Sequence, residues 1–210
     1  KRDVARANKV FCLMQQLVVD SGGFVRQFIF DDKGCVFIAV WGTPSCAHDD
    51  DATRAVTTAM EMIDRLHKIE VVASIGVTTG RAFCGDVGSV ERREYACVGD
   101  VVNLSARLMG RCLGGQILVD KVTESLTRLS IRYAALAPIY VKGRTAAVKV
   151  YSPIEVGGNV DDSEQSGPGR RLSRTSSSAL LASLRIVGNE HILKIFDTIV
   201  SELAKSPDAH

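Results

Sequence analysis

The stretch Glu94-Tyr95-Ala96-Cys97-Val98-Gly99-Asp100-Val101-Val102-Asn103-Leu104-Ser105-Ala106-Arg107-Leu108-Met109 decides how the rest of the chain is interpreted. A short β-type run ends at Gly99, and Asp100 is suited to cap a helix that starts immediately after it. Asn103 and Arg107 are four residues apart, so they rise from one face of that helix, one turn above the other. The buried stripe of the same helix would consist of Val101, Leu104, Ser105 and Leu108.

The Asn103/Arg107 pair suits an anionic group that has a hydroxyl nearby. Arginine offers a fixed fork of donors for phosphate oxygens, and asparagine both donates and accepts hydrogen bonds. A solvated helix face with no binding role is the plain alternative, because Asn and Arg at this spacing are common. Spacing alone leaves both interpretations open.

The motif Gly-Asp-Val-Val-Asn-Leu-Ser-Ala-Arg-Leu at 99–108 resembles the most recognisable motif of class III nucleotidyl cyclases. The similarity covers most of residues 1–155. Its nearest counterpart is the second catalytic domain of soluble, bicarbonate-responsive adenylyl cyclases, and Asp32-Lys33-Gly34-Cys35-Val36-Phe37 is especially similar to that subgroup. The segments that carry the resemblance are Phe24–Gly42, Ser74–Gly88, Arg93–Met109 and Val141–Tyr151.

Hydrophobic periodicity predicts alternating helices and strands over the first 155 residues. This order indicates an α+β sandwich with a mostly antiparallel sheet. It agrees with the ferredoxin-like cyclase fold without its first strand. The expected helices are 4–19, a segment that ends near 67, the motif helix and 121–129; the expected strands are 24–30, 35–41, 70–77, 81–87, the run up to Gly99, 116–119, 131–136, 139–142 and 147–151.

The composition changes from Val156 onward, where Gly, Pro and Ser predict a flexible linker over 156–180. Within it, Arg170-Arg171-Leu172-Ser173 has the pattern that basophilic kinases favour, which makes Ser173 a candidate phosphorylation site. An apolar stripe predicts a helical tail over 181–210. The tail resembles the start of the ATPase-like region that follows the second domain in long soluble cyclases. It contains no phosphate-binding loop motif, so we predict no ATPase activity.

Composition and charge indicate which broad class of protein this chain belongs to. The chain is 46% hydrophobic, carries a formal charge of +2 and has six cysteines without a C-x-x-C pair. These values predict a globular, cytoplasmic protein with buried thiols and with no nucleic-acid partner, no metal site of its own and no membrane segment. His48, two residues after Cys46, is the nearest approach to metal-ligand spacing, and we predict no metal site there.

The resemblance implies roles for individual residues. In the family, one half carries two metal-binding aspartates, and the other half recognises the base and acts on the transition state. Asn103 resembles the residue that orients the ribose, and Arg107 resembles the one that neutralises charge on the α-phosphate. Lys142 is similar to the lysine that contacts the terminal phosphates, and Lys33 to the lysine that contacts the purine in the soluble subgroup. Exposed lysines without a role remain the alternative for Lys142 and Lys33.

The sequence departs from the family pattern at the base and metal positions. Ala96 takes the place of a base-reading Thr or Asp, so only backbone groups near Cys97 and Val98 remain to read a base edge. The second metal-aspartate position falls on Cys35, and the first belongs to the missing strand. The resemblance therefore implies that Mg²⁺ or Mn²⁺ is bound mainly by a partner half.

The chain is thus predicted to be the second catalytic half of an adenylyl cyclase, inactive alone, that converts ATP to cyclic AMP and pyrophosphate when paired with a first half. A cyclase-derived regulatory or dimerisation module that catalyses nothing is the alternative, and Ala96 favours it. An unrelated ferredoxin-like RNA-binding domain is a third interpretation. It lacks the paired aromatic residues that such domains use for stacking.

Overall fold

The computed structural model describes residues 2–31, 34–44, 46–157 and 180–187 of the chain. The predicted Lys33, the linker with Ser173 and the tail beyond Val187 lie outside these described residues. Among the described residues, none of the helices combines the length and the apolar character needed to cross a membrane.

The secondary structure follows the predicted order up to Val156. The helices are α1 (Arg2–Asp20), α2 (Asp51–His67), α3 (Asp100–Met109) and α4 (Lys121–Thr127). The strands are β1 (Phe24–Asp31), β2 (Gly34–Trp41), β3 (Val72–Thr79), β4 (Phe83–Gly88), β5 (Arg93–Val98), β6 (Ile117–Asp120), β7 (Ile131–Ala135), β8 (Val150–Val156) and β9 (Leu180–Val187). The predicted strand at 139–142 is wrong, because this segment makes only an isolated bridge between Ile139 and Val148.

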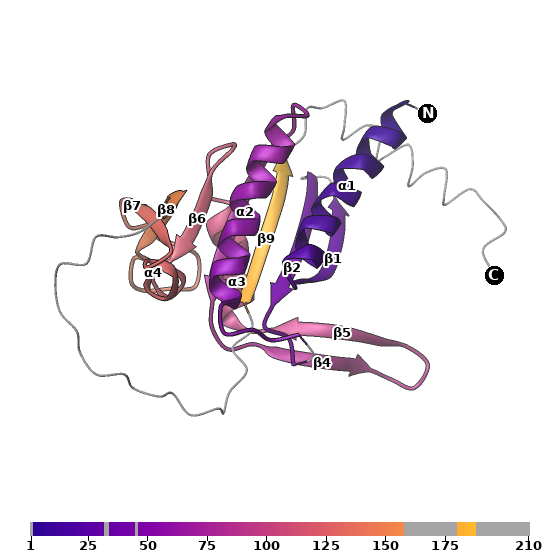
Figure 1. Cartoon of the computed structure of the whole chain (residues 1–210). Coiled ribbons are helices and arrows are strands. Elements are labelled where there is room, and N and C mark those ends of the chain that lie inside the picture. The colour runs from indigo at the N-terminus through magenta and orange to yellow at the C-terminus, as the bar shows by residue number, and fades with distance from the viewer. Residues whose placement is uncertain (1, 32–33, 45, 158–179, 188–210) are drawn as a thin grey trace.

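The strands form a seven-stranded sheet in the order β1-β2-β9-β3-β6-β8-β7 and a separate two-stranded sheet of β4 and β5. Within the large sheet only β3 and β6 pair in parallel. The predicted α+β architecture with a mostly antiparallel sheet is therefore confirmed. Figure 1 shows the β4–β5 hairpin projecting away from the end of the large sheet.

Strand β9 lies at the centre of the large sheet, which corrects the predicted helical tail for residues 181–187. It pairs antiparallel with β2 from Cys35↔Ile186 to Trp41↔Leu180, and antiparallel with β3 along its whole length. The expected ferredoxin-like sheet lacked one strand, and β9 fills the position between β2 and β3; Figure 1 shows β9, in yellow, beside β2. The strand that completes the sheet therefore comes from a segment that follows the predicted linker.

Strand β3 separates two layers of helices, because successive side chains point to opposite faces of a sheet. Ala73, Ile75 and Val77 belong to the large hydrophobic cluster that also contains residues of α1 and α2. From the other face, Thr78 donates a 2.9 Å hydrogen bond from Oγ1 to the backbone oxygen of Val101 in α3. The sheet is therefore covered by α1 and α2 on one face and by α3 on the other.

Helix α3 approaches β3 most closely at Gly76. A Cβ atom at Gly76 would lie 2.2 Å from the backbone oxygen of Ser105, a separation that no side chain can accept. The absence of a side chain at this point lets the helix backbone pack directly on the strand. This contact sets the height of α3 over the sheet, and with it the position of Asn103 and Arg107.

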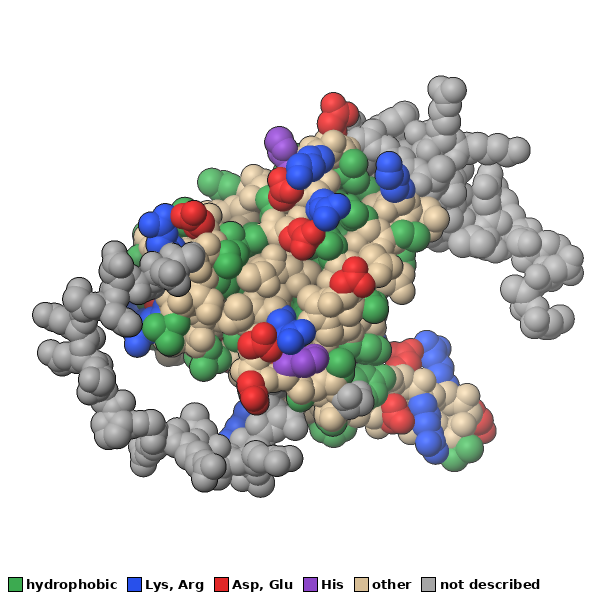
Figure 2. All heavy atoms as spheres, in the orientation of Figure 1, with side chains coloured by type: hydrophobic (Ala, Val, Ile, Leu, Met, Phe, Trp, Pro, Cys, Tyr) green, Lys and Arg blue, Asp and Glu red, His purple; other side chains and the backbone are tan. Residues whose placement is uncertain are grey.

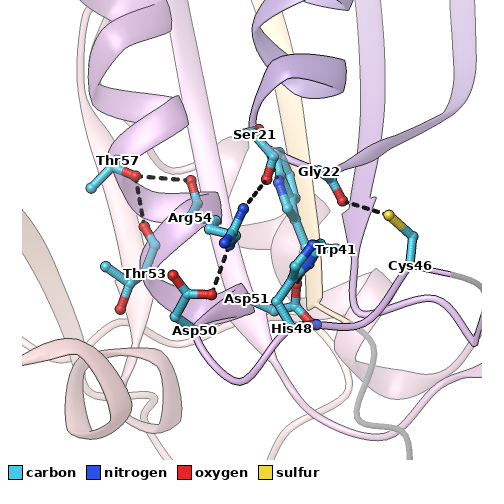
Figure 3. A network of polar contacts seen from close by, with 10 residues as sticks. All are labelled: Ser21, Gly22, Trp41, Cys46, His48, Asp50, Asp51, Thr53, Arg54 and Thr57. Atoms are coloured by element: carbon cyan, nitrogen blue, oxygen red, sulfur yellow. Dashed lines mark hydrogen bonds and ion pairs between the residues drawn. The ribbon is translucent and has the colours of Figure 1, made fainter.

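A polar network joins the end of α1, the end of β2 and the start of α2 (Figure 3). Trp41 donates from Nε1 to Oγ of Ser21 at 3.1 Å, and Arg54 donates to the backbone oxygen of Ser21 at 3.4 Å. His48 is bound to the carboxylate of Asp51 through its backbone nitrogen at 2.9 Å and through Nδ1 at 3.1 Å. Asp51 therefore ties the loop before α2 to the first turn of that helix.

Charges of both signs alternate along the outer face of α2. Arg54 pairs with Asp50, Arg65 with Glu61 and Lys68 with Asp64, each at four-residue spacing. Figure 2 shows Lys and Arg beside Asp and Glu across this face of the molecule. Because opposite charges are interspersed, the face in view lacks the single-sign field that attracts a nucleic acid.

Candidate functional site

Helix α3 presents Asn103 and Arg107 on its open side. Asn103 is exposed and Arg107 is half-buried. The other side of the helix buries the predicted stripe, with Met109 added to it. Both side chains thus rise from one face of a helix whose opposite face is anchored in the core.

The first turn of α3 differs from the prediction. Gly99, with an extended φ of 170°, occupies the N-cap position, and no side chain caps the helix. Asp100 is instead the first helical residue, and its carboxylate accepts a hydrogen bond from the guanidinium of Arg144 in an ion pair. The predicted capping role of Asp100 is wrong, because its carboxylate is held by a loop that lies far away in the sequence.

The segment Tyr140–Arg144 lies along α3. At one end Arg111, just beyond the helix, donates to the backbone oxygen of Tyr140 at 3.2 Å. At the other end lies the Arg144–Asp100 ion pair. Between them, Val141 is buried in a small cluster with side chains of the helix, Leu104 and Leu108. The segment is therefore fixed over the whole length of α3.

This arrangement brings the Lys142 backbone close to Arg107. Gly143 has a φ of +81°, a conformation that favours glycine, and a Cβ atom built there would lie 3.4 Å from Nη2 of Arg107. The Arg107 guanidinium thus packs against the backbone of Gly143, and the exposed Lys142 immediately precedes it. The backbone that carries Lys142 therefore runs past the side of α3 that presents Arg107.

The three predicted base-reading positions lie on β5 and do not form one surface. Cys97 packs inward with Val40 and Val101. Ala96 and Val98 point to the opposite face of the strand, where Val98 is 61% exposed. Ala96 pairs with Gly85 of β4, so neither residue adds a polar side chain. Any reading of a base at this point would depend on the backbone.

The described surface has one hollow of about 410 Å³ and another of about 540 Å³. The 540 Å³ hollow adjoins the Tyr140–Arg144 segment. The larger hollow is lined by Leu104 of α3, by the segment 143–149 and by the start of α4. Three of its lining residues are cationic, namely Lys121, Arg144 and Lys149. Sequence reasoning missed Arg144, although it follows directly on the Val-Lys-Gly pattern.

Buried Asp120 forms one wall of this hollow and starts α4. Its Oδ1 accepts hydrogen bonds from the backbone nitrogen of Thr123 at 3.1 Å and from the Thr123 hydroxyl at 2.5 Å. Burial raises the pKa of the Asp120 carboxyl above its usual value, and the bonds from Thr123 oppose this shift. Asp120 is therefore engaged in holding α4, which is a structural task.

Residues 25–153 match the family described as the adenylate and guanylate cyclase catalytic domain. The match covers the hairpin, α3 with Asn103 and Arg107, and the segment with Lys142. The chain belongs to this family.

Individual relatives support the cyclase assignment. Human adenylate cyclase type 10 is 42% identical over 116 residues, which are 54% of this chain and 7% of that protein. Adenylate cyclase 1 of Rhizobium meliloti is 27% identical over 164 residues, which are 73% of this chain and 24% of the relative. This chain therefore spans a small part of the curated cyclases that it matches.

A solved cyclase structure supports the fold. The guanylyl cyclase Cya2 superposes with a TM-score of 0.68 at 26% identity, covering 76% of this chain and 84% of that chain. The α+β cyclase fold is thus common to both chains, although they differ at three positions in four.

Class III cyclases use a divalent metal, and the residue of this chain at the expected metal position does not suit one. Cys35, at the position that the resemblance assigns to a metal-binding aspartate, is 3% exposed and belongs to the large hydrophobic cluster. A buried thiol is a poor ligand for Mg²⁺, which prefers oxygen. In the described ranges no group of three or more His, Cys, Asp or Glu residues could hold a metal. Cys46 donates to the backbone oxygen of Gly22 and His48 contacts Asp51, as Figure 3 shows.

Proposed function

We propose that this domain is the second catalytic half of an adenylate cyclase, which converts ATP to cyclic AMP and pyrophosphate when paired with a first half. The observation that carries the proposal is the contrast between two sites. Asn103 is exposed and Arg107 is half-buried on one face of α3, where the guanidinium lies close to Gly143, the residue after exposed Lys142, while Cys35 at the metal position is buried. A domain of this kind needs a partner that supplies the carboxylates for Mg²⁺ or Mn²⁺.

The reaction is an internal phosphoryl transfer, in which the ribose 3′-hydroxyl attacks the α-phosphorus and pyrophosphate leaves. Positioning and stabilisation of charge on the phosphate oxygens supply most of the catalysis in such a reaction. Asn103 would orient the ribose, Arg107 would neutralise the charge that develops on the α-phosphate, and Lys142 would contact the terminal phosphates. The approach of Arg107 to Gly143 supports this division, because it brings the guanidinium close to the backbone that follows Lys142.

The surface of the β4–β5 hairpin supports pairing with a second domain. Three of its apolar side chains, Phe83, Val87 and Val98, are more than half exposed, and Val90 at the tip is 90% exposed. Exposed apolar residues that gather on one projecting element are typical of a protein interface. The hairpin ends next to Gly99, where α3 begins, so a partner bound there would lie close to Asn103.

Ala96 favours a second candidate function, a regulatory module that pairs with a cyclase half but catalyses nothing. Its methyl group cannot form the hydrogen bond that tells adenine from guanine, and its neighbour across the hairpin is Gly85. The two candidates differ in one respect that can be measured. Only the catalytic half makes the activity of the pair depend on Arg107.

The test is an assay of cyclic nucleotide production from ATP and from GTP with manganese. The whole chain is assayed alone and then mixed with a first-half domain that carries both metal aspartates. We expect no product from the chain alone and cyclic AMP from the mixture, and the yield from GTP measures how far a pair that contains Ala96 distinguishes the two bases. Product from the isolated chain would contradict the need for a partner. A mixture that produces only what the first half produces alone would favour the regulatory module.

A further inference from the structure

The β4–β5 hairpin brings two cysteines together across its strands. Cys84 and Cys97 are directly paired in the register of β4 and β5, and the Cys84 thiol donates to Sγ of Cys97 at 3.6 Å. Both side chains are half-buried. Such proximity could not be read from the sequence, because the two residues do not form a C-x-x-C pair.

The backbone geometry suits a disulfide bond between them. Directly opposite residues of an antiparallel pair have Cα atoms about 4.5 to 5.5 Å apart, and disulfides span about 4.4 to 6.8 Å. The two sulfur atoms must approach from 3.6 Å to about 2.05 Å. Rotation of the side chains is sufficient for this, so the strands need not separate.

The surroundings hold both thiols in place. Cys84 and Cys97 pack against Val40 and Val101, on the inner face of the hairpin. Tyr95, on the same face of β5, meets the Phe24 ring edge-on with centroids 5.6 Å apart. Burial, followed by the hydrogen bond with Cys84, raises the pKa of the Cys97 thiol. Cys97 is therefore a thiol rather than a thiolate at neutral pH.

We propose that Cys84 and Cys97 form a reversible disulfide, which makes the base of the hairpin a thiol–disulfide redox site. The oxidant class is a small disulfide such as oxidised glutathione. The Cys84 thiolate attacks one sulfur of that disulfide and releases one glutathione thiolate. Cys97 then passes its proton to the released glutathione thiolate and attacks Sγ of Cys84, which breaks the mixed disulfide and releases the second glutathione. In sum, two protein thiols are oxidised and one glutathione disulfide is reduced to two thiols.

Formation of the disulfide would affect the end of β5, which leads directly into α3. The disulfide would link the strands at Cys97, between Ala96 and Val98 and two residues before Gly99. The outward side chains Phe83 and Val98 would stay exposed, because they point away from the thiols. This inference does not depend on the proposed cyclase role, since it concerns the hairpin alone.

Mass spectrometry of the whole chain tests the proposal. The protein is incubated with increasing oxidised glutathione, remaining thiols are alkylated, and trypsin is added without reductant. Cleavage at arginine separates Cys84, in residues 82–92, from Cys97, in residues 94–107. We expect these two peptides to become linked, with the loss of two hydrogen atoms, and to separate again after treatment with dithiothreitol.

Two variants and two internal controls sharpen the result. Cys97→Ser should abolish the link and leave Cys84 carrying glutathione, whereas Cys84→Ser should leave Cys97 as a thiol. Circular dichroism checks that both variants are folded. Exposed Cys12 and Cys46 report how far glutathione has reacted. If they are modified while Cys84 and Cys97 remain reduced, or carry separate glutathione groups, the proposal is wrong.

Discussion

The central sheet and the β4–β5 hairpin are both built mainly of antiparallel strands but differ in what covers them. Seven of the eight residues of β3 are buried, whereas none of the six residues of β4 is. The sheet lies between α1 and α2 on one face and α3 on the other, while the hairpin stands away from it in Figure 1. The difference indicates that stability resides in the sheet and that the hairpin is available for a partner.

The largest expected difference between the two regions is in the free energy of unfolding when one large aromatic side chain is removed from each. Trp41 is 1% exposed and also donates to Ser21, so Trp41→Ala should lower the free energy of unfolding by about 3 to 5 kcal/mol. Phe83→Ala on the hairpin should change it by less than about 0.5 kcal/mol, because Phe83 is 56% exposed. Chemical denaturation of both variants measures the two values. Equal losses would show that the hairpin carries stability as the sheet does.

A proline substitution tests whether β9 holds the centre of the sheet. Leu184 pairs with Phe37 on one side and with Ile75 on the other. Leu184→Pro removes a ladder hydrogen bond in a strand with neighbours on both sides, and should cost about 2 to 3 kcal/mol. Thermal unfolding of this variant is compared with Val90→Pro at the hairpin tip, which should unfold like the parent. An unchanged Leu184→Pro variant would contradict the central position of β9.

A charge on the outer face of the hairpin should affect pairing more than folding. Val98→Asp places a carboxylate where an apolar side chain is exposed, and we expect the half-saturating concentration of a first-half domain to rise about tenfold, or about 1.4 kcal/mol. The thermal midpoint of the isolated chain should stay within a few degrees. Titration of the mixture by activity gives the first value. An unchanged affinity for the first-half domain would show that this face of the hairpin is not part of the interface.

The smallest expected effect is a change in how stability depends on pH. The folded-state pKa of Asp120 is raised by burial, so the folded protein binds a proton more tightly than the unfolded chain. The contribution of Asp120 to stability should therefore fall as the pH rises from its unfolded pKa of 3.8 to its raised folded pKa. Asp120→Asn should lack this decrease, whereas exposed Asp86→Asn on the hairpin should retain it. Denaturation across this pH range distinguishes the two variants.

Local patterns predicted most of the fold and part of the site. The spacing of apolar residues gave α1, α2 and α3 because each helix buries one stripe, and it placed Asn103 and Arg107 on the open face. The apolar stripe that begins at Ile186 predicted a helical tail over 181–210, whereas Leu180–Val187 is a strand, because an apolar stripe does not reveal which strands will flank it. Backbone pairing with β2 and β3 outweighed the helical spacing.

Contacts between distant segments were beyond prediction for a related reason. The capping role of Asp100 was predicted from its neighbours in the sequence. Its actual partner, Arg144, lies 44 residues further along the chain. Lys142 was identified by resemblance, and the approach of its segment to Arg107 follows only from the way Val141 and Arg144 fix that segment on α3. The Cys84–Cys97 contact depends on the register of the hairpin, which composition does not set.

The most direct test of the account is the turnover number of Arg107→Ala in a mixture with a first-half domain, with ATP and manganese. The matched control is Arg65→Ala, which removes the same charge from an exposed pair with Glu61 on α2. We predict that Arg107→Ala lowers turnover by about 10²- to 10³-fold at an unchanged half-saturating concentration of the partner, while Arg65→Ala behaves like the parent. Equal turnover in the two variants would contradict a catalytic role for this domain.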